Sequence, residues 1–155
     1  MDGGEPVAGV IDAPALGEVY TALRGHGAFL NGRPIQASSV ADPTRAMIEM
    51  GWSGRVPKPV FMDKMDAIME LGAMPRSGGC GALALADVAS GRLDGYIEIV
   101  INLWDVAAAL PLLMEAGARV SPFLRDGGLT GGATILAANP HIADQLAQAV
   151  AIPLE

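Results

Sequence analysis

The stretch that decides the fold covers residues 76–118 and reads RSGGCGALALADVASGRLDGYIEIVINLWDVAAALPLLMEAGA. Small helix-forming residues at 82–90 predict a short helix, and Gly91 predicts its end, because glycine adopts the left-handed conformation without a Cβ penalty. The apolar run at 93–100 predicts a strand, and residues 105–116 predict a second helix. Helix, strand and helix in close succession indicate the α/β class.

The part of the chain before residue 46 predicts antiparallel β structure. Residues 6–13 and 18–24 contain strand-forming residues and are separated by a turn-like Pro-Ala-Leu-Gly. Asn31-Gly32 predicts a tight hairpin, because both residues tolerate positive φ.

Beyond that point strands and helices alternate. Further strands are predicted at 46–50, 74–76, 119–121 and 134–138. Helices are predicted at 60–71 and, with Asn139 as N-cap and Pro140 at the first helical position, up to about residue 150. The sequence therefore predicts an α/β fold in which an antiparallel hairpin region precedes a mixed sheet of about five strands flanked by helices.

The composition disfavours several classes of function. A net charge of -7 argues against nucleic acid as a partner, because a phosphate backbone requires clustered Lys and Arg. No apolar stretch approaches the roughly 20 residues of a membrane helix, and the single cysteine predicts neither an internal disulfide nor a zinc cluster. Without a recognisable signal peptide, a cytoplasmic location is expected. The charged fraction of 17% is low and indicates apolar surface that another surface covers, so a homodimer is an open alternative.

Asp105 is the first candidate for chemistry. It follows a predicted strand and begins a predicted helix, which allows two interpretations. As an N-cap it would accept hydrogen bonds from free backbone N–H groups, which is the commoner role. As a residue beyond the carboxyl end of a strand, where α/β sheets build their sites, it would be a metal-binding carboxylate.

The glycine-rich turn Gly78-Gly79-Cys80-Gly81 is the second candidate. Its N–H groups could bind phosphate or sugar oxygens at a helix N-terminus, although such turns are more often only structural. Cys80 has no histidine near it in sequence to activate a nucleophile, so a small buried thiol is expected.

Asp94 and Glu98 lie four residues apart on a predicted strand and share one face. Like charges on a buried face are unfavourable, so at least one is expected to contact water or a polar ligand, and a solvated position is the simpler interpretation. His26 and His141 are isolated and are predicted to be surface residues. Four methionines are predicted to fill the core: Met62, Met65, Met69 and Met74.

The order of these signals resembles the C-terminal signature region of the inositol monophosphatase family. That family pairs a Gly-Ser/Thr-Ala-type turn with the pattern VA.GR.DGY.E, followed by WD.AA and EAG. The residues that match in register are Gly79-Cys80-Gly81-Ala82, Val88-Ala89, Gly91-Arg92, Asp94-Gly95-Tyr96, Glu98, Trp104-Asp105, Ala107-Ala108 and Glu115-Ala116-Gly117. The stretches GVIDAPALGEVYTALRGHGAFLNGRPI upstream and GGLTGGATILAANP downstream are also similar, so the resemblance covers essentially the whole chain.

The resemblance implies magnesium-dependent hydrolysis of phosphate monoesters of inositol or related sugars and polyols. It implies that Asp105 is a Mg²⁺ ligand and that Glu98 binds a substrate hydroxyl with help from the Gly79, Cys80 and Gly81 backbone. Trp104 would shape the pocket, and no residue is assigned as a catalytic acid or base. Residues 1–45 would be a remnant of the family's N-terminal β-sheet domain, and residues 46–155 its C-terminal α/β domain.

The chain departs from the family pattern in its metal ligands. The family's Asp-Pro-(Ile/Leu)-Asp-Gly-(Ser/Thr) motif and an earlier Glu-Glu pair are absent from the sequence. One carboxylate rarely holds Mg²⁺, so the chain is expected to supply the C-terminal part of a site and to be inactive alone. Smaller departures are Cys80 for Ser or Thr, Ala118 for a second Gly, and Pro111, which is expected to kink its helix.

Two alternatives stay open. The chain could belong to a family member specific for histidinol phosphate or a nucleotide bisphosphate. It could instead be a truncated, non-catalytic domain that self-associates through an exposed sheet edge and an uncovered apolar face.

Overall fold

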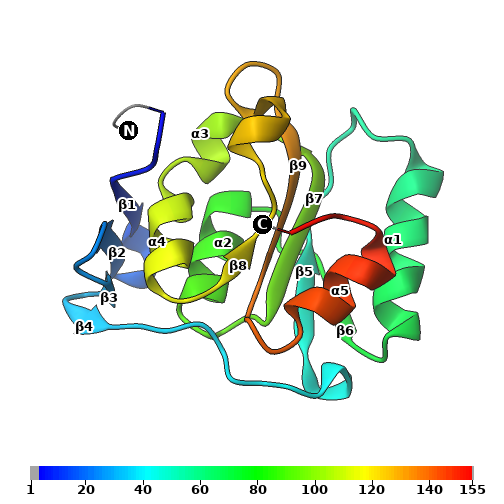
Figure 1. The fold of residues 1–155 in the computed structure, drawn as a ribbon, viewed down its shortest axis with the longest axis horizontal. Coiled ribbons are helices and arrows are strands. Elements are labelled where there is room, and N and C mark those ends of the chain that lie inside the picture. Colours follow the sequence, from blue (N-terminus) through cyan, green and yellow to red (C-terminus); the bar gives the residue numbers. More distant parts are fainter. Residues whose placement is uncertain (1–3, 155) are drawn as a thin grey trace.

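The computed structural model describes residues 4–154 and begins with a four-stranded antiparallel sheet (Figure 1). Its strands lie side by side in chain order: β1 (Ala8–Ala13), β2 (Glu18–Leu23), β3 (Ala28–Leu30) and β4 (Arg33–Pro34). Asn31 and Gly32 join the last two strands with φ values of 49° and 75°, so the predicted Asn-Gly turn is confirmed.

A second sheet contains five strands and is mixed. The order across it is β6 (Met74–Arg76), β5 (Met47–Met50), β7 (Gly95–Ile101), β9 (Ala133–Ala138) and β8 (Arg119–Val120). β5 is parallel to both of its neighbours, whereas β9 is antiparallel to β7 and β8. The predicted α/β class and the predicted mixed sheet are therefore confirmed.

Helices separate the two sheets and cover the outer face of the larger one (Figure 1). α2 (Gly81–Ala89) and α4 (Ala109–Glu115) lie between the sheets and contact both of them. α1 (Lys58–Glu70) and α5 (Ala143–Val150) pack together on the opposite face of the larger sheet. Within the described residues, no helix is both long enough and apolar enough to span a membrane.

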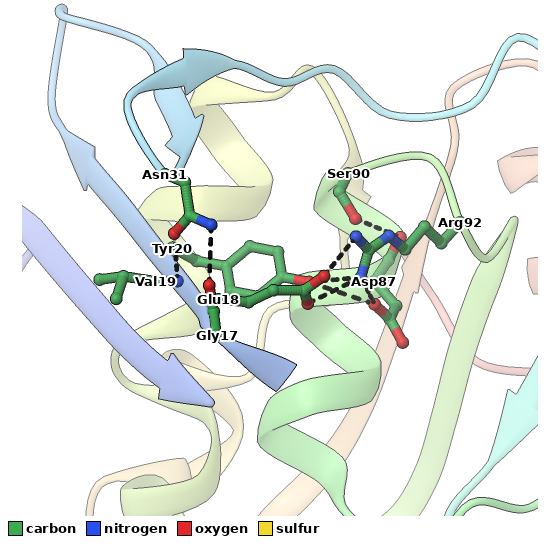
Figure 2. Close-up of polar contacts among 8 residues, drawn as sticks. All are labelled: Gly17, Glu18, Val19, Tyr20, Asn31, Asp87, Ser90 and Arg92. Carbon is green, nitrogen blue, oxygen red and sulfur yellow. Dashed lines mark hydrogen bonds and ion pairs between the residues drawn. The ribbon is translucent and has the colours of Figure 1, made fainter. Parts of the chain in front are cut away.

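A polar network ties the first sheet to the end of α2 (Figure 2). The Arg92 guanidinium donates to both carboxylate oxygens of Glu18, at 2.7 and 2.8 Å, and to the Tyr20 hydroxyl at 2.9 Å. Tyr20 is fully buried and donates to Glu18, while the Asp87 carboxylate lies 3.5 Å from Arg92. β2 is thus connected through side chains to the segment that joins α2 to β7.

The helix predicted at 105–116 is two shorter segments, α3 (Leu103–Val106) and α4. Pro111 has no N–H to donate to the carbonyl of Ala107, four residues earlier, so the hydrogen-bond ladder is interrupted there. The backbone at Ala107 and Ala108 nevertheless keeps right-handed helical angles, at φ -54°, ψ -41° and φ -75°, ψ -27°. α3 and α4 are thus separated at Ala107 and Ala108, which precede Pro111 and keep helical backbone angles.

Two other predictions need correction. α5 begins at Ala143, and Asn139 instead accepts N–H bonds from His141 and Ile142 in the turn before it. The methionines are mostly not core residues, because Met62, Met69 and Met74 are 40%, 50% and 63% exposed. Only Met65 packs partly against the core, since α1 turns its Phe61, Met65 and Ile68 face toward the sheet. His26 and His141 are exposed, as predicted.

Candidate active site

A pocket of about 160 Å³ lies at the carboxyl ends of β5 and β7. These strands are parallel, so both end at the same edge of the sheet, where the starts of α2 and α3 also lie. The residues that line the pocket are Glu49, Gly51, Trp52, Gly79, Cys80, Gly81, Tyr96, Glu98, Ile101 and Asp105. Three of these are carboxylates and none is Lys or Arg, which gives the pocket a negative lining.

Glu98 projects into this pocket from β7 beside Tyr96. The Tyr96 hydroxyl donates to Glu98 Oε2 at 2.5 Å, and Tyr96 is 1% exposed. Partial burial raises the pKa of the Glu98 carboxyl, and the nearby Asp105 carboxylate raises it further, whereas the Tyr96 hydrogen bond and the Arg55 guanidinium lower it. Glu98 is thus a half-buried acceptor with one oxygen already bonded.

Glu49 also lines the pocket, and sequence reasoning missed it. Only 3% exposed, it lies at the end of β5, pairs with Arg76 Nε at 3.0 Å and accepts the Gly78 N–H at 3.0 Å. These contacts connect β5 to the glycine turn that follows β6. A signal existed in the sequence, because Glu49 is the one charged residue in the apolar Met-Ile-Glu-Met run that ends this strand.

The glycine turn opens α2 and presents its backbone to the pocket. Gly79 has φ +83°, and Gly81, the first helical residue, lies so close to β7 that a β-carbon there would come within 2.8 Å of the Tyr96 hydroxyl. Cys80 is exposed at the pocket, so the expected buried thiol is wrong. It precedes the helix instead of lying on its packed face, where Ala84 and Leu85 are buried.

Asp105 does not cap a helix. α3 begins at Leu103 with Asn102 at the N-cap position, which places Asp105 in the first turn. Its half-buried side chain lines the pocket and, among the described residues, forms no ion pair or side-chain hydrogen bond. Trp104 does not line the pocket and is 78% exposed. The indole at the pocket is that of Trp52, which packs edge-on against Phe61 with a distance of 4.9 Å between the ring centroids.

Asp94 is not the solvated charge that was expected. It is 7% exposed, and its carboxylate accepts the Met47 N–H at 2.8 Å and the Asn139 side-chain amide at 3.2 Å. Asp94 therefore supports the opposite end of β7 and does not take part in the pocket.

The fit to a magnesium ion is incomplete. Across residues 4–154, no group of three His, Cys, Asp or Glu side chains is arranged to hold a metal. Glu49 is engaged by Arg76 and Glu98 by Tyr96, which leaves Asp105 as the pocket carboxylate best able to face a cation. These residues do not form a metal centre by themselves.

Comparisons with known proteins agree with the fold. The model of the inositol monophosphatase family matches residues 1–153. The chain is 38% identical to an inositol-1-monophosphatase of Mesorhizobium japonicum, over 97% of this chain and 58% of that protein. It is 32% identical to a histidinol-phosphatase of Chlorobaculum parvum, over 92% of this chain and 54% of that protein.

Solved structures give the same relationship. SuhB of Mycobacterium tuberculosis superposes with a TM-score of 0.85 at 34% identity, over 97% of this chain and 60% of the other. An inositol monophosphatase from Anabaena superposes with a TM-score of 0.82 at 33% identity, over 95% of this chain and 60% of the other. The chain spans 54–60% of the length of these relatives. It belongs to the inositol monophosphatase family.

Proposed function

We propose that this chain forms the polyol-binding part of the active site of a magnesium-dependent enzyme that hydrolyses phosphate monoesters of inositol or related sugars. One observation carries the proposal: Asp105, Glu98 and the Gly79–Gly81 backbone line a single pocket, although they come from three separate segments. A lining of carboxylates and backbone groups suits hydroxyl groups, because a hydroxyl donates to carboxylates and accepts from N–H groups.

Each residue then has a specific role. Glu98 accepts a hydrogen bond from a ring hydroxyl, and the turn before α2 donates backbone N–H groups to ring oxygens. Asp105 faces the phosphate side of the substrate and is one ligand of the metal. Trp104, which is largely exposed beside Asp105, contacts the part of a substrate that projects from the pocket.

Magnesium is the cofactor expected for this family. Mg²⁺ in proteins usually takes one or two carboxylates together with phosphate oxygens and water. Because no three His, Cys, Asp or Glu side chains among the described residues are arranged to hold a metal, Asp105 is not expected to retain the ion alone. We therefore expect this chain by itself to bind the polyol portion of a substrate and to release little or no phosphate.

The test combines phosphate release with ligand binding by the 155-residue chain. Inositol 1-phosphate is supplied with and without Mg²⁺, and myo-inositol binding is followed by NMR in the wild type, Glu98→Gln and Asp105→Asn. Binding that Glu98→Gln weakens, without turnover, supports the proposal. Magnesium-dependent turnover that Asp105→Asn abolishes also supports it and overturns the expected inactivity. A folded chain with neither binding nor turnover overturns the proposed function.

Histidinol phosphate is the second candidate substrate. Three carboxylates without a lining Lys or Arg would attract the ammonium group of this substrate, and one relative is named a histidinol-phosphatase. An NMR competition experiment with myo-inositol and histidinol, followed on the resonances of the pocket residues, distinguishes the two candidate substrates. Tighter binding of histidinol, weakened by salt, would favour the amine substrate.

A role in self-association is the candidate from another class. The outer face of the first sheet exposes Val10, Val19 and Leu23 at 61%, 39% and 45%. Uncovered apolar residues next to an open strand edge favour pairing with another copy of the chain. Light scattering after size exclusion tests this: a dimer that Val10→Lys dissociates supports self-association, and a monodisperse monomer contradicts it.

A further inference from the structure

Tyr96 is hydrogen-bonded to Glu98, but it has no role in the function proposed above. They are two residues apart on β7, so their side chains emerge on the same face of the strand. The O–H···O distance of 2.5 Å is at the short end for a hydrogen bond to a carboxylate, a charge-assisted type stronger than neutral bonds. Both side chains line the pocket.

Two glycines enclose this pair. A β-carbon on Gly51 would lie 2.3 Å from Glu98 Oε2 and 2.4 Å from the Tyr96 hydroxyl. On the other segment, a β-carbon on Gly81 would lie 2.8 Å from the same hydroxyl. The backbone after β5 and the backbone at the start of α2 therefore lie against the bonded atoms and limit movement of the pair on those two sides.

We propose that Tyr96 is a positioning residue for polyol binding: it holds Oε2 of Glu98, so that Oε1, which accepts no hydrogen bond from the described residues, is presented to a ligand hydroxyl. The identity of the ligand rests on the proposed function, whereas the positioning of Glu98 does not. A fixed acceptor favours a hydroxyl at one place and in one orientation, because binding does not have to order the carboxylate first. Tyr96 would thus contribute to selectivity without touching the ligand.

The charges around Glu98 determine how its pKa changes when the Tyr96 hydroxyl is removed. The Tyr96 bond and the Arg55 guanidinium favour the ionised carboxylate, whereas burial and the Asp105 carboxylate oppose it, and Glu49 lines the same pocket. Loss of the Tyr96 hydroxyl therefore raises the pKa of Glu98 and frees its side chain to change rotamer.

Tyr20 provides a matched control. It is also a fully buried tyrosine whose hydroxyl donates to a glutamate two residues away, Glu18 at 2.9 Å, but it lies in the network of Figure 2 and not in the pocket. Tyr96→Phe and Tyr20→Phe each delete one buried hydroxyl. A general loss of stability would affect both variants, whereas a positioning effect on Glu98 is confined to Tyr96→Phe.

The experiment follows the ¹³C carboxyl signal of Glu98 against pH in the full chain, with the signal identified by its loss in Glu98→Gln. Tyr96→Phe is expected to raise the titration midpoint, and Tyr20→Phe to leave it unchanged. An unchanged midpoint in Tyr96→Phe overturns the proposal, whether or not the chain binds a polyol. Gly51→Ala, which leaves the hydroxyl in place but intrudes on the pair, is expected to shift the same signal.

Binding of myo-inositol is the second readout. Tyr96→Phe is expected to weaken it about tenfold, and Tyr20→Phe to leave it unchanged. Equal affinity of the wild type and Tyr96→Phe overturns the positioning role. If the wild type binds no myo-inositol but the Glu98 midpoint still shifts in Tyr96→Phe, the polyol assignment fails and the Tyr96–Glu98 coupling stands.

Discussion

Gly9 lies directly against Ala108: a β-carbon at residue 9 would come within 2.0 Å of the Ala108 carbonyl oxygen and 2.9 Å of Pro111 Cγ. β1 thus crosses α4 where Pro111 interrupts the helical hydrogen bonds. Any side chain at residue 9 must push the first sheet away from the helices beneath it. Gly9→Ala is expected to lower the free energy of unfolding by about 2–4 kcal/mol, measured by urea denaturation.

Gly54→Ala is the control for that substitution. A β-carbon at Gly54 would meet no heavy atom within 4 Å, and such a surface change is expected to stay within about 0.5 kcal/mol of the wild type. Equal stability of Gly9→Ala and Gly54→Ala would contradict the close approach of β1 and α4.

Glu115 fastens the end of α4 to the turn between β2 and β3. Its two carboxylate oxygens accept the N–H groups of Gly25 and Gly27, each at 2.8 Å. These two bonds lower the pKa of the Glu115 carboxyl. Glu115→Gln keeps the shape but offers only one acceptor oxygen, so a loss of about 1 kcal/mol is expected at neutral pH by urea denaturation.

The pH dependence of that loss has a definite sign. A carboxyl whose pKa is lower in the folded state stabilises the protein above the pKa of the unfolded chain, and this stabilisation disappears as the pH falls through the folded value. The difference in the free energy of unfolding between the wild type and Glu115→Gln is therefore largest at neutral pH. It decreases below about pH 4.3, the ordinary pKa of a Glu side chain. A difference that grows toward acid pH would contradict the two hydrogen bonds.

The strands and helices could be predicted because each carries its own local signal. β6 begins and ends at the predicted residues. α2 ends before Gly91, and the Gly91 φ of +73° is the left-handed conformation from which the helix end was predicted. Pro111 was expected to kink a single helix over 105–116, since a proline lacks the donor that an α-helix interior requires, whereas the helix is interrupted at Ala107 and Ala108.

The pocket was only partly predictable, because its members meet through tertiary contacts. Glu49 is a site residue only because β5 and β6 are neighbours, which brings Arg76 and Gly78 to its carboxylate. Likewise, two tryptophans were available, and only the path of the loop after β5 determines that Trp52, not Trp104, lines the pocket. The spacing of residues along the chain predicts neither the contacts of Glu49 nor the position of Trp52.

Arg76 is expected to stabilise the glycine turn through Glu49. The Glu49 side chain is 4% exposed, so removal of its partner leaves a buried carboxylate with the Gly78 N–H as its remaining described contact, whereas the Arg76 side chain is 46% exposed. Arg76→Met is therefore expected to cost about 1–2 kcal/mol in thermal or urea denaturation, less than a fully buried pair. Arg33→Met, at an exposed residue of β4, is the control, and equal losses in both variants would contradict a specific role.

Arg92 is expected to stabilise the protein mainly at neutral pH. Its hydrogen bonds lower the pKa of Glu18, so that contribution is lost as the pH falls through the folded value. Burial raises the pKa of Asp87, and the Arg92 guanidinium opposes this rise. In Arg92→Met the pKa of Asp87 in the folded state is therefore higher than in the wild type. The variant loses additional stability as the pH increases through this folded-state pKa, because Asp87 must then ionise while buried.

Both effects have the same sign, so the deficit of Arg92→Met relative to the wild type should be small at pH 3 and largest near pH 7. Thermal denaturation of the wild type, Arg92→Met, Glu18→Gln and the double variant across this range measures the coupling. The guanidinium contacts both carboxylates from the segment after α2 (Figure 2), so the two single losses should not add. Additive losses at neutral pH, or a deficit independent of pH, would mean that the Arg92–Glu18 contact does not hold the first sheet on α2.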